Sequence, residues 1–86
     1  MTLNNTFNAV SDPTRRQILK LLKKKDMSVT DIMKNFSITM PSLSHHLTIL
    51  KNANLVTSRR DGQQIFYSLN LSVFEEFLNA IYKFFK

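Results

Sequence analysis

The chain contains a single glycine, Gly62, which follows Asp61 between two short runs of strand-favouring residues. An Asp-Gly pair in this setting is a strong signal for a β-hairpin, because glycine readily adopts the positive φ angle that a tight turn needs. One alternating set in the second run predicts a half-buried strand face: Ile65, Tyr67 and Leu69. We therefore expect a two-stranded hairpin over residues 56–69. The scarcity of glycine and proline elsewhere favours helix.

Helix-start signals divide the segment before this hairpin. Asp12, followed by a proline, suits the cap and first position of a helix. Ser28 begins a sequence that resembles a capping box, with Asp31 in place of the usual glutamate. Thr39 can cap a third helix, whose first turn tolerates a proline. Two short helices joined by a brief turn form a helix-turn-helix, predicted here at 28–52, and a hairpin directly after it makes the winged form.

Apolar residues at helical spacing predict two further helices, at 3–10 and 71–86. In the last helix the apolar side chains spread over an arc of about 160°, wider than the stripe that one small core requires. A monomer would expose much of this arc, and large exposed apolar patches are rare. The predicted fold class is therefore mainly α with a small β-hairpin: one winged helix-turn-helix domain over residues 1–86, with about five helices and a partner surface at its end.

Positive charge is concentrated in one part of the chain. The net charge is +6, but residues 15–60 carry ten Lys and Arg against Asp26 and Asp31, which is +8, and the remainder sums to −2. Such a field suggests a polyanionic partner, either nucleic acid or an anionic membrane surface. The N-terminal stretch MTLNNTFNAV has no signal-peptide character, and no apolar run approaches the length that crosses a bilayer. We therefore expect a cytoplasmic protein.

A leucine seam orients the helix that begins near residue 40. It consists of three residues at i, i+4 and i+7: Leu43, Leu47 and Leu50. His45 then points away from the core, whereas His46 falls at its margin, where we expect a structural hydrogen bond. The exposed side keeps short polar groups that can reach base edges or phosphates. The predicted DNA contacts are Met40, Ser42, Ser44, His45 and Thr48 on this helix, and Arg59, Arg60 and Gln63 in the wing.

Neither a metal site nor an active site is predicted. Adjacent residues of a helix do not share a face, so His45 and His46 cannot chelate one ion, and the chain has no cysteine. Ser42 could reach His45, but no strained nucleophile turn or glycine-rich oxyanion loop accompanies the pair. We therefore expect no catalytic residue, no metal ligand and no cofactor.

Several strings, in this order and spacing, resemble the ArsR family of bacterial winged-helix repressors. They are SDPTRRQIL (11–19), SVTDI (28–32), SLSHHLTIL (42–50), NLV (54–56) and RRDGQQIFYSL (59–69). Within the family they are most similar to the small SdpR-type autorepressors. The resemblance implies a recognition helix at 40–52 in the major groove of double-stranded DNA and a wing at 56–69 on the adjacent backbone. It also implies, for SdpR-type members, a membrane protein that sequesters the repressor.

The resemblance further implies a homodimer formed through the first and last helices. The interface residues expected on this basis are Leu3, Phe7, Phe74, Phe77, Leu78, Ile81 and Phe85. Metal-sensing members carry cysteines in the helix that corresponds to residues 28–33, and this chain has none there. Its last helix offers only Glu75 and Glu76 as ligands, so we expect no metal control.

The leading interpretation is a dimeric repressor that occludes a promoter by binding an imperfect palindrome, with autorepression among the implied roles. The alternative is a winged-helix adaptor whose C-terminal aromatic helix, ending in KFFK, docks on a membrane or a protein. Steep salt dependence is expected of the first, and binding to anionic vesicles of the second.

Overall fold

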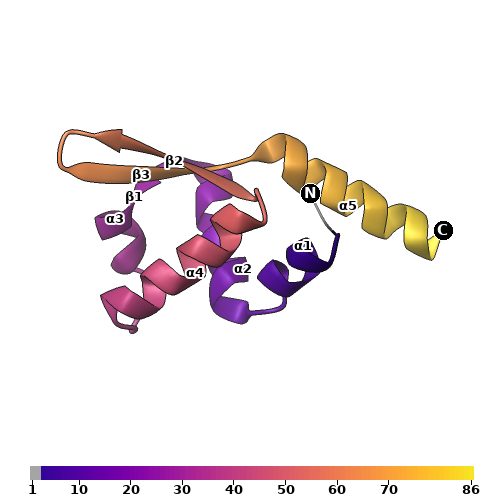
Figure 1. Cartoon of the computed structure of the whole chain (residues 1–86), viewed down its shortest axis with the longest axis horizontal. Helices are drawn as coiled ribbons and strands as arrows, with labels where there is room; N and C mark the ends of the chain where they lie inside the picture. The colour runs from indigo at the N-terminus through magenta and orange to yellow at the C-terminus, as the bar shows by residue number, and fades with distance from the viewer. Residues whose placement is uncertain (1–2) are drawn as a thin grey trace.

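Residues 3–86, which the computed structural model describes, form five helices and a three-stranded antiparallel sheet (Figure 1). In chain order these are α1 (Leu3–Val10), α2 (Pro13–Lys24), β1 (Met27–Ser28), α3 (Val29–Met33), α4 (Met40–Asn52), β2 (Val56–Asp61), β3 (Gln64–Leu69) and α5 (Leu71–Phe85). Met1 and Thr2, which begin the N-terminal stretch considered above, lie outside the described residues. The predicted winged helix-turn-helix fold is confirmed.

Side-chain caps begin three of the helices at the predicted positions. The cap oxygen in each case accepts a hydrogen bond from the backbone N–H three residues later, which satisfies a group that the helix itself leaves unpaired. The pairs are Asp12 with Arg15 at 3.0 Å, Ser28 with Asp31 at 3.1 Å, and Thr39 with Ser42 at 3.2 Å. The second half of the capping box is absent, because Asp31 turns its carboxylate toward Lys34 at 3.2 Å.

An asparagine takes the place of glycine where α4 ends. Asn54 has a φ of 60°, in the left-handed region that asparagine tolerates better than most residues. Its N–H donates to the carbonyl of Lys51 at 2.9 Å, and the N–H of Leu55 donates to the carbonyl of Leu50 at 3.0 Å. These two bonds form a Schellman motif, which turns the chain from α4 into the wing.

The sheet has the strand order β1-β3-β2, so the predicted hairpin is joined by a third strand that the sequence did not reveal. β1 is antiparallel to β3, and its Met27 pairs with Tyr67. The two residues of β1 are too few to show the alternation by which a strand is predicted from sequence. In the hairpin, Asp61 pairs with Gln64, and Gly62 begins the two-residue loop with a φ of 64°. The expected need for a glycine at this turn is confirmed.

The leucine seam of α4 is buried against the other helices of the body. It packs in a core with further apolar side chains from four other elements: Ala9, Ile18, Leu19, Leu22, Ile32 and Val56. Tyr67 and Leu69 pack on this core, as the alternation predicted. Ile65 is 36% exposed, contrary to expectation, because the hairpin extends past the helices toward its tip (Figure 1).

The C-terminal helix α5 leaves the body and runs along the long axis of the molecule (Figure 1). Within Leu71–Phe85 the one buried side chain is Phe77, whose ring meets that of Phe7 edge-on at 5.5 Å. Phe77 is only 7% exposed and holds α5 to its own chain, so little of its side chain is left for the predicted dimer interface. Among the described residues, no helix is both long and apolar enough to cross a bilayer.

Candidate nucleic-acid interface

A groove of about 390 Å³ lies between α3, α4 and the wing, and we call it the α4–wing groove. It is lined by Val29, Thr30, Ser44, Leu47, Thr48, Gln63, Gln64, Ile65 and Tyr67. The structure therefore brings together three predicted contacts from two elements, namely Ser44, Thr48 and Gln63. Thr30 was missed, because only the packing of α3 against β3 and β1 brings it to the groove.

The remaining predicted contacts of α4 lie outside the groove, toward the start of the helix. Met40 and His45 are exposed and Ser42 is half-buried, so the predicted outward position of His45 is confirmed. The hydroxyl of Thr48 donates to the carbonyl of Ser44 at 2.9 Å, which leaves its oxygen able to accept a hydrogen bond. Ser42, Ser44 and Thr48 on α4 thus offer small donors and acceptors without a formal charge.

The two arginines of the wing point to opposite faces of the sheet. Arg59 stands opposite Phe66, and its guanidinium lies 5.1 Å from the centre of that ring and 3.0 Å from a carboxylate oxygen of Asp26. Arg60 stands opposite Ile65, one of the groove residues, and within residues 3–86 it forms no ion pair. The expected pair of equivalent DNA contacts is thus divided: Arg60 shares the face of the groove, and Arg59 is engaged on the other side.

His46 makes the structural hydrogen bond that the sequence predicted. Its Nδ1 lies 3.1 Å from Nη1 of Arg15, and its ring is largely covered. Arginine can only donate, so this contact is a hydrogen bond when Nδ1 carries no proton. The rings of His45 and His46 diverge, with centres 6.0 Å apart. No group of three His, Cys, Asp or Glu side chains that could hold a metal occurs among the described residues.

Arg15 is the interior partner that sequence reasoning misplaced. It is one of the ten Lys and Arg counted in residues 15–60, but it is only 7% exposed. Besides His46 it donates to the carbonyls of Ala9 at 2.8 Å and Asn8 at 3.0 Å, so it caps the end of α1 and ties that helix to α4. The sequence of two adjacent arginines does not indicate which side chain is buried. The neighbouring Arg16 is exposed and donates to Val10 at 2.9 Å.

Two ionisable groups beside the interface have shifted pKa values. The pKa of Asp12 is lowered, first by the hydrogen bond from the backbone N–H of Arg15 and further by the nearby His46 and Arg15 side chains. Burial raises the pKa of Tyr67 in the groove wall. At neutral pH the first group is therefore a carboxylate that caps α2, and the second is a neutral phenol that can donate a hydrogen bond.

Comparisons with known proteins agree with this geometry. The pattern described as "Bacterial regulatory protein, arsR family" matches residues 12–58. The chain is 51% identical over 82 residues to the transcriptional repressor SdpR of Bacillus subtilis (strain 168), covering 95% of this chain and 91% of that protein. It is 33% identical over 79 residues to an arsenical resistance operon repressor of Staphylococcus aureus, covering 92% and 76%. A crystal structure of an ArsR family transcriptional regulator has the same fold, with a TM-score of 0.88, 25% identity, and 94% and 89% coverage.

The matched segment begins at the cap of α2 and runs through the helix-turn-helix into β2. The relatives are transcriptional regulators and not enzymes. The sequence match and the winged fold lead to one assignment. This chain belongs to the ArsR family of bacterial regulatory proteins.

Proposed function

We propose that the chain is a sequence-specific DNA-binding repressor that acts as a homodimer on an imperfect palindrome, without metal control. The observation that carries the proposal is the α4–wing groove, where polar groups of a helix and a wing converge on one exposed surface. The similarity to repressors over almost the whole chain supports it. Repression would follow from occlusion of a promoter, with no chemical step.

In this proposal α4 enters the major groove, which is about 12 Å wide and admits a helix. The hydroxyls of Ser44 and Thr48 and the amide of Gln63 can both donate and accept, as recognition of base edges or phosphates requires. Met40 can meet the methyl group of a thymine. Arg60, on the groove side of the wing, is suited to a phosphate.

The proposed dimer rests on the surface that α1 and α5 leave uncovered. Leu3 and Phe7 on α1 are each 44% exposed. On α5 the exposed large apolar side chains are Leu71, Leu78, Tyr82, Phe84 and Phe85. A two-fold axis through these helices would repeat α4 in the partner, with recognition helices about 34–36 Å apart on one face of the duplex. An operator with two related half-sites is expected for that reason.

Selection of bound fragments from random DNA tests the proposal directly. It should return a two-fold symmetric site, and the complex should contain two chains per site. Thr48→Glu places a negative charge in the groove and should weaken binding to that site at least about tenfold. Thr57→Glu is the matched control, because Thr57 is exposed on β2 with its side chain on the face opposite the groove. Recovery of no preferred sequence at low salt would refute the proposal.

The wing arginines provide a second test through salt dependence. Arg60→Ala should reduce the slope of log affinity against log salt by about one unit, the value for one lost phosphate contact. Arg59→Ala should change the slope less, because its guanidinium already pairs with Asp26. Equal slopes for Arg60→Ala and the unmodified protein would exclude Arg60 from phosphate binding.

The adaptor alternative has one observation in its favour. Phe84 and Phe85 are 80% and 79% exposed, and they stand between Lys83 and Lys86. Cosedimentation with anionic vesicles, together with failure to select any DNA sequence, would favour this alternative. The names of the relatives reported above mention no membrane partner, so the proposed repressor does not include one.

A further inference from the structure

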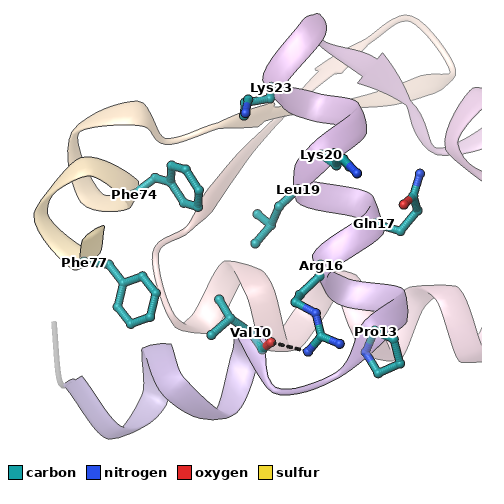
Figure 2. A pocket seen from close by; sticks show the side chains of 9 residues that line it. All are labelled: Val10, Pro13, Arg16, Gln17, Leu19, Lys20, Lys23, Phe74 and Phe77. Carbon is teal, nitrogen blue, oxygen red and sulfur yellow. Dashed lines mark hydrogen bonds between the residues drawn. The ribbon is translucent and has the colours of Figure 1, made fainter. Parts of the chain in front are cut away.

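We infer that a hollow between α2 and α5 binds a small organic anion with an apolar body, such as a medium-chain carboxylate. The hollow measures about 550 Å³, within the range of small-molecule sites. It shares no residue with the α4–wing groove. Figure 2 shows its lining: Val10, Pro13, Arg16, Gln17, Leu19, Lys20, Lys23, Phe74 and Phe77.

The floor of the hollow is apolar and comes from three helices. Leu19 of α2 and Phe77 of α5 are buried beneath it, and Val10 and Phe74 are partly buried at its sides. In Figure 2 the two phenylalanine rings face Leu19 across the space. Each methylene group that a ligand buries here would strengthen binding about fourfold, so a chain of several carbons is needed for measurable binding.

The rim of the hollow is cationic and carries no acidic side chain. Arg16, Lys20 and Lys23 follow one another at i, i+4 and i+7, so they share one face of α2. Arg16 uses Nη1 for the carbonyl of Val10. Within residues 3–86 neither Lys20 nor Lys23 forms an ion pair or hydrogen bond with a side chain. An apolar floor below three cations is the complement of a carboxylate on a hydrocarbon body.

A second copy of the chain fits this hollow less well. The exposed last turns of α5 would bring aromatic rings and two cations, Lys83 and Lys86, toward a rim that is already positive. The acids of α5, Glu75 and Glu76, lie in its first half. Repulsion between these like charges would oppose docking of a second copy. A phosphate backbone would satisfy the rim and leave the apolar floor unused. The small amphiphilic anion satisfies both parts.

A titration of the full chain with decanoate, kept below its micellar concentration, tests the inference by nuclear magnetic resonance. Saturable shifts are expected at backbone amides of the lining residues on α2 and α5, while those of Phe84 and Phe85 stay unchanged. Decyltrimethylammonium has the same chain with the opposite charge, and butyrate has the same charge with a short chain. Each should bind at least about tenfold more weakly if charge and chain both contribute. No DNA is present, so this result is independent of the proposed repressor function.

A pair of matched double variants separates the rim from general positive charge. Lys20→Gln with Lys23→Gln should weaken decanoate binding at least about tenfold. Lys24→Gln with Lys25→Gln removes the same charge from exposed residues that do not line the hollow, and should leave the affinity unchanged. Equal effects of the two double variants, or equal affinity for the cationic amphiphile, would overturn the inference. Sedimentation shows whether decanoate dissociates a dimer. If decanoate binds only when dimers dissociate, a second copy of the chain is the normal occupant of the hollow, and the inference is overturned.

Discussion

α4 and α5 are amphipathic helices of similar length, 13 and 15 residues, but they bury their apolar faces very differently. All three leucines of the α4 seam are inside the body, whereas α5 buries Phe77 alone within Leu71–Phe85. The core of one chain fully covers the narrow seam of α4, and it covers only the first turns of the wide face of α5. The comparison teaches that α4 is positioned by its own chain and leaves its polar side exposed. The apolar surface left on α5 is where the proposed dimer would form.

Two adjacent residues of α5 give the largest expected contrast. Phe77→Ala should lower the free energy of unfolding by about 3 kcal/mol, because it removes a ring buried against Phe7 and leaves a cavity. Leu78→Ala should change the unfolding of the monomer by less than about 0.5 kcal/mol, because Leu78 is exposed, and should instead weaken self-association. Urea unfolding at several protein concentrations and sedimentation separate these effects. If Phe77→Ala and Leu78→Ala reduced the stability of the monomer equally, α5 would be packed on the body on both sides, and not through Phe77 alone.

The link between α1 and α4 provides the next test. Arg15→Met should lower the free energy of unfolding by about 2–3 kcal/mol, because it leaves the Ala9 carbonyl and His46 without their donor. Arg16→Met is the matched control and should cost less than about 1 kcal/mol, since that side chain is exposed. Urea unfolding measures both. If the two variants lost equal stability, the positioning of α4 would not depend on the buried arginine.

The smallest expected effect concerns how the stability of the folded chain depends on pH in the acid range. Folding lowers the pKa of Asp12 from its ordinary value of 3.8, so the carboxylate stabilises the folded chain. This contribution is complete above the unfolded value and is lost as the pH falls through the folded pKa. Asp12→Asn keeps a capping oxygen, so it should cost about 0.5 kcal/mol at neutral pH and nothing in acid.

Thermal unfolding over a pH series checks this expectation. Asp12→Ala provides the comparison, since it removes the capping oxygen as well and should lose about 1 kcal/mol at neutral pH. If Asp12→Asn lost as much thermal stability on acidification as the unmodified protein, other carboxylates would account for the acid dependence.

Features that depend on neighbours along the chain could be predicted. The caps Asp12, Ser28 and Thr39, the leucine seam and the turn at Gly62 all depend on contacts within a few residues. The outward position of His45 follows from the same helical spacing. This local information was enough for the fold class and for three residues of the groove, Ser44, Thr48 and Gln63.

Features that depend on contacts across the chain could not be predicted. β1 exists because β3 passes beside it, and Arg59 turns to Asp26, which is 33 residues away in sequence. Thr30 enters the groove only through the packing of α3 against β3 and β1. For each of these three contacts, the residues next to it in sequence do not specify which distant residue it meets.

The sequence by itself determined where helices start, which side of α4 faces the core and where the hairpin turns, because hydrogen-bond spacing and side-chain periodicity act over one or two helical turns. Only the tertiary structure decided that Arg15 is interior, that Arg59 and Arg60 separate, and that Phe77 belongs to its own chain. An arginine or a phenylalanine has the same local preferences in either place. Its burial depends on which distant side chains and carbonyls arrive beside it when the chain folds.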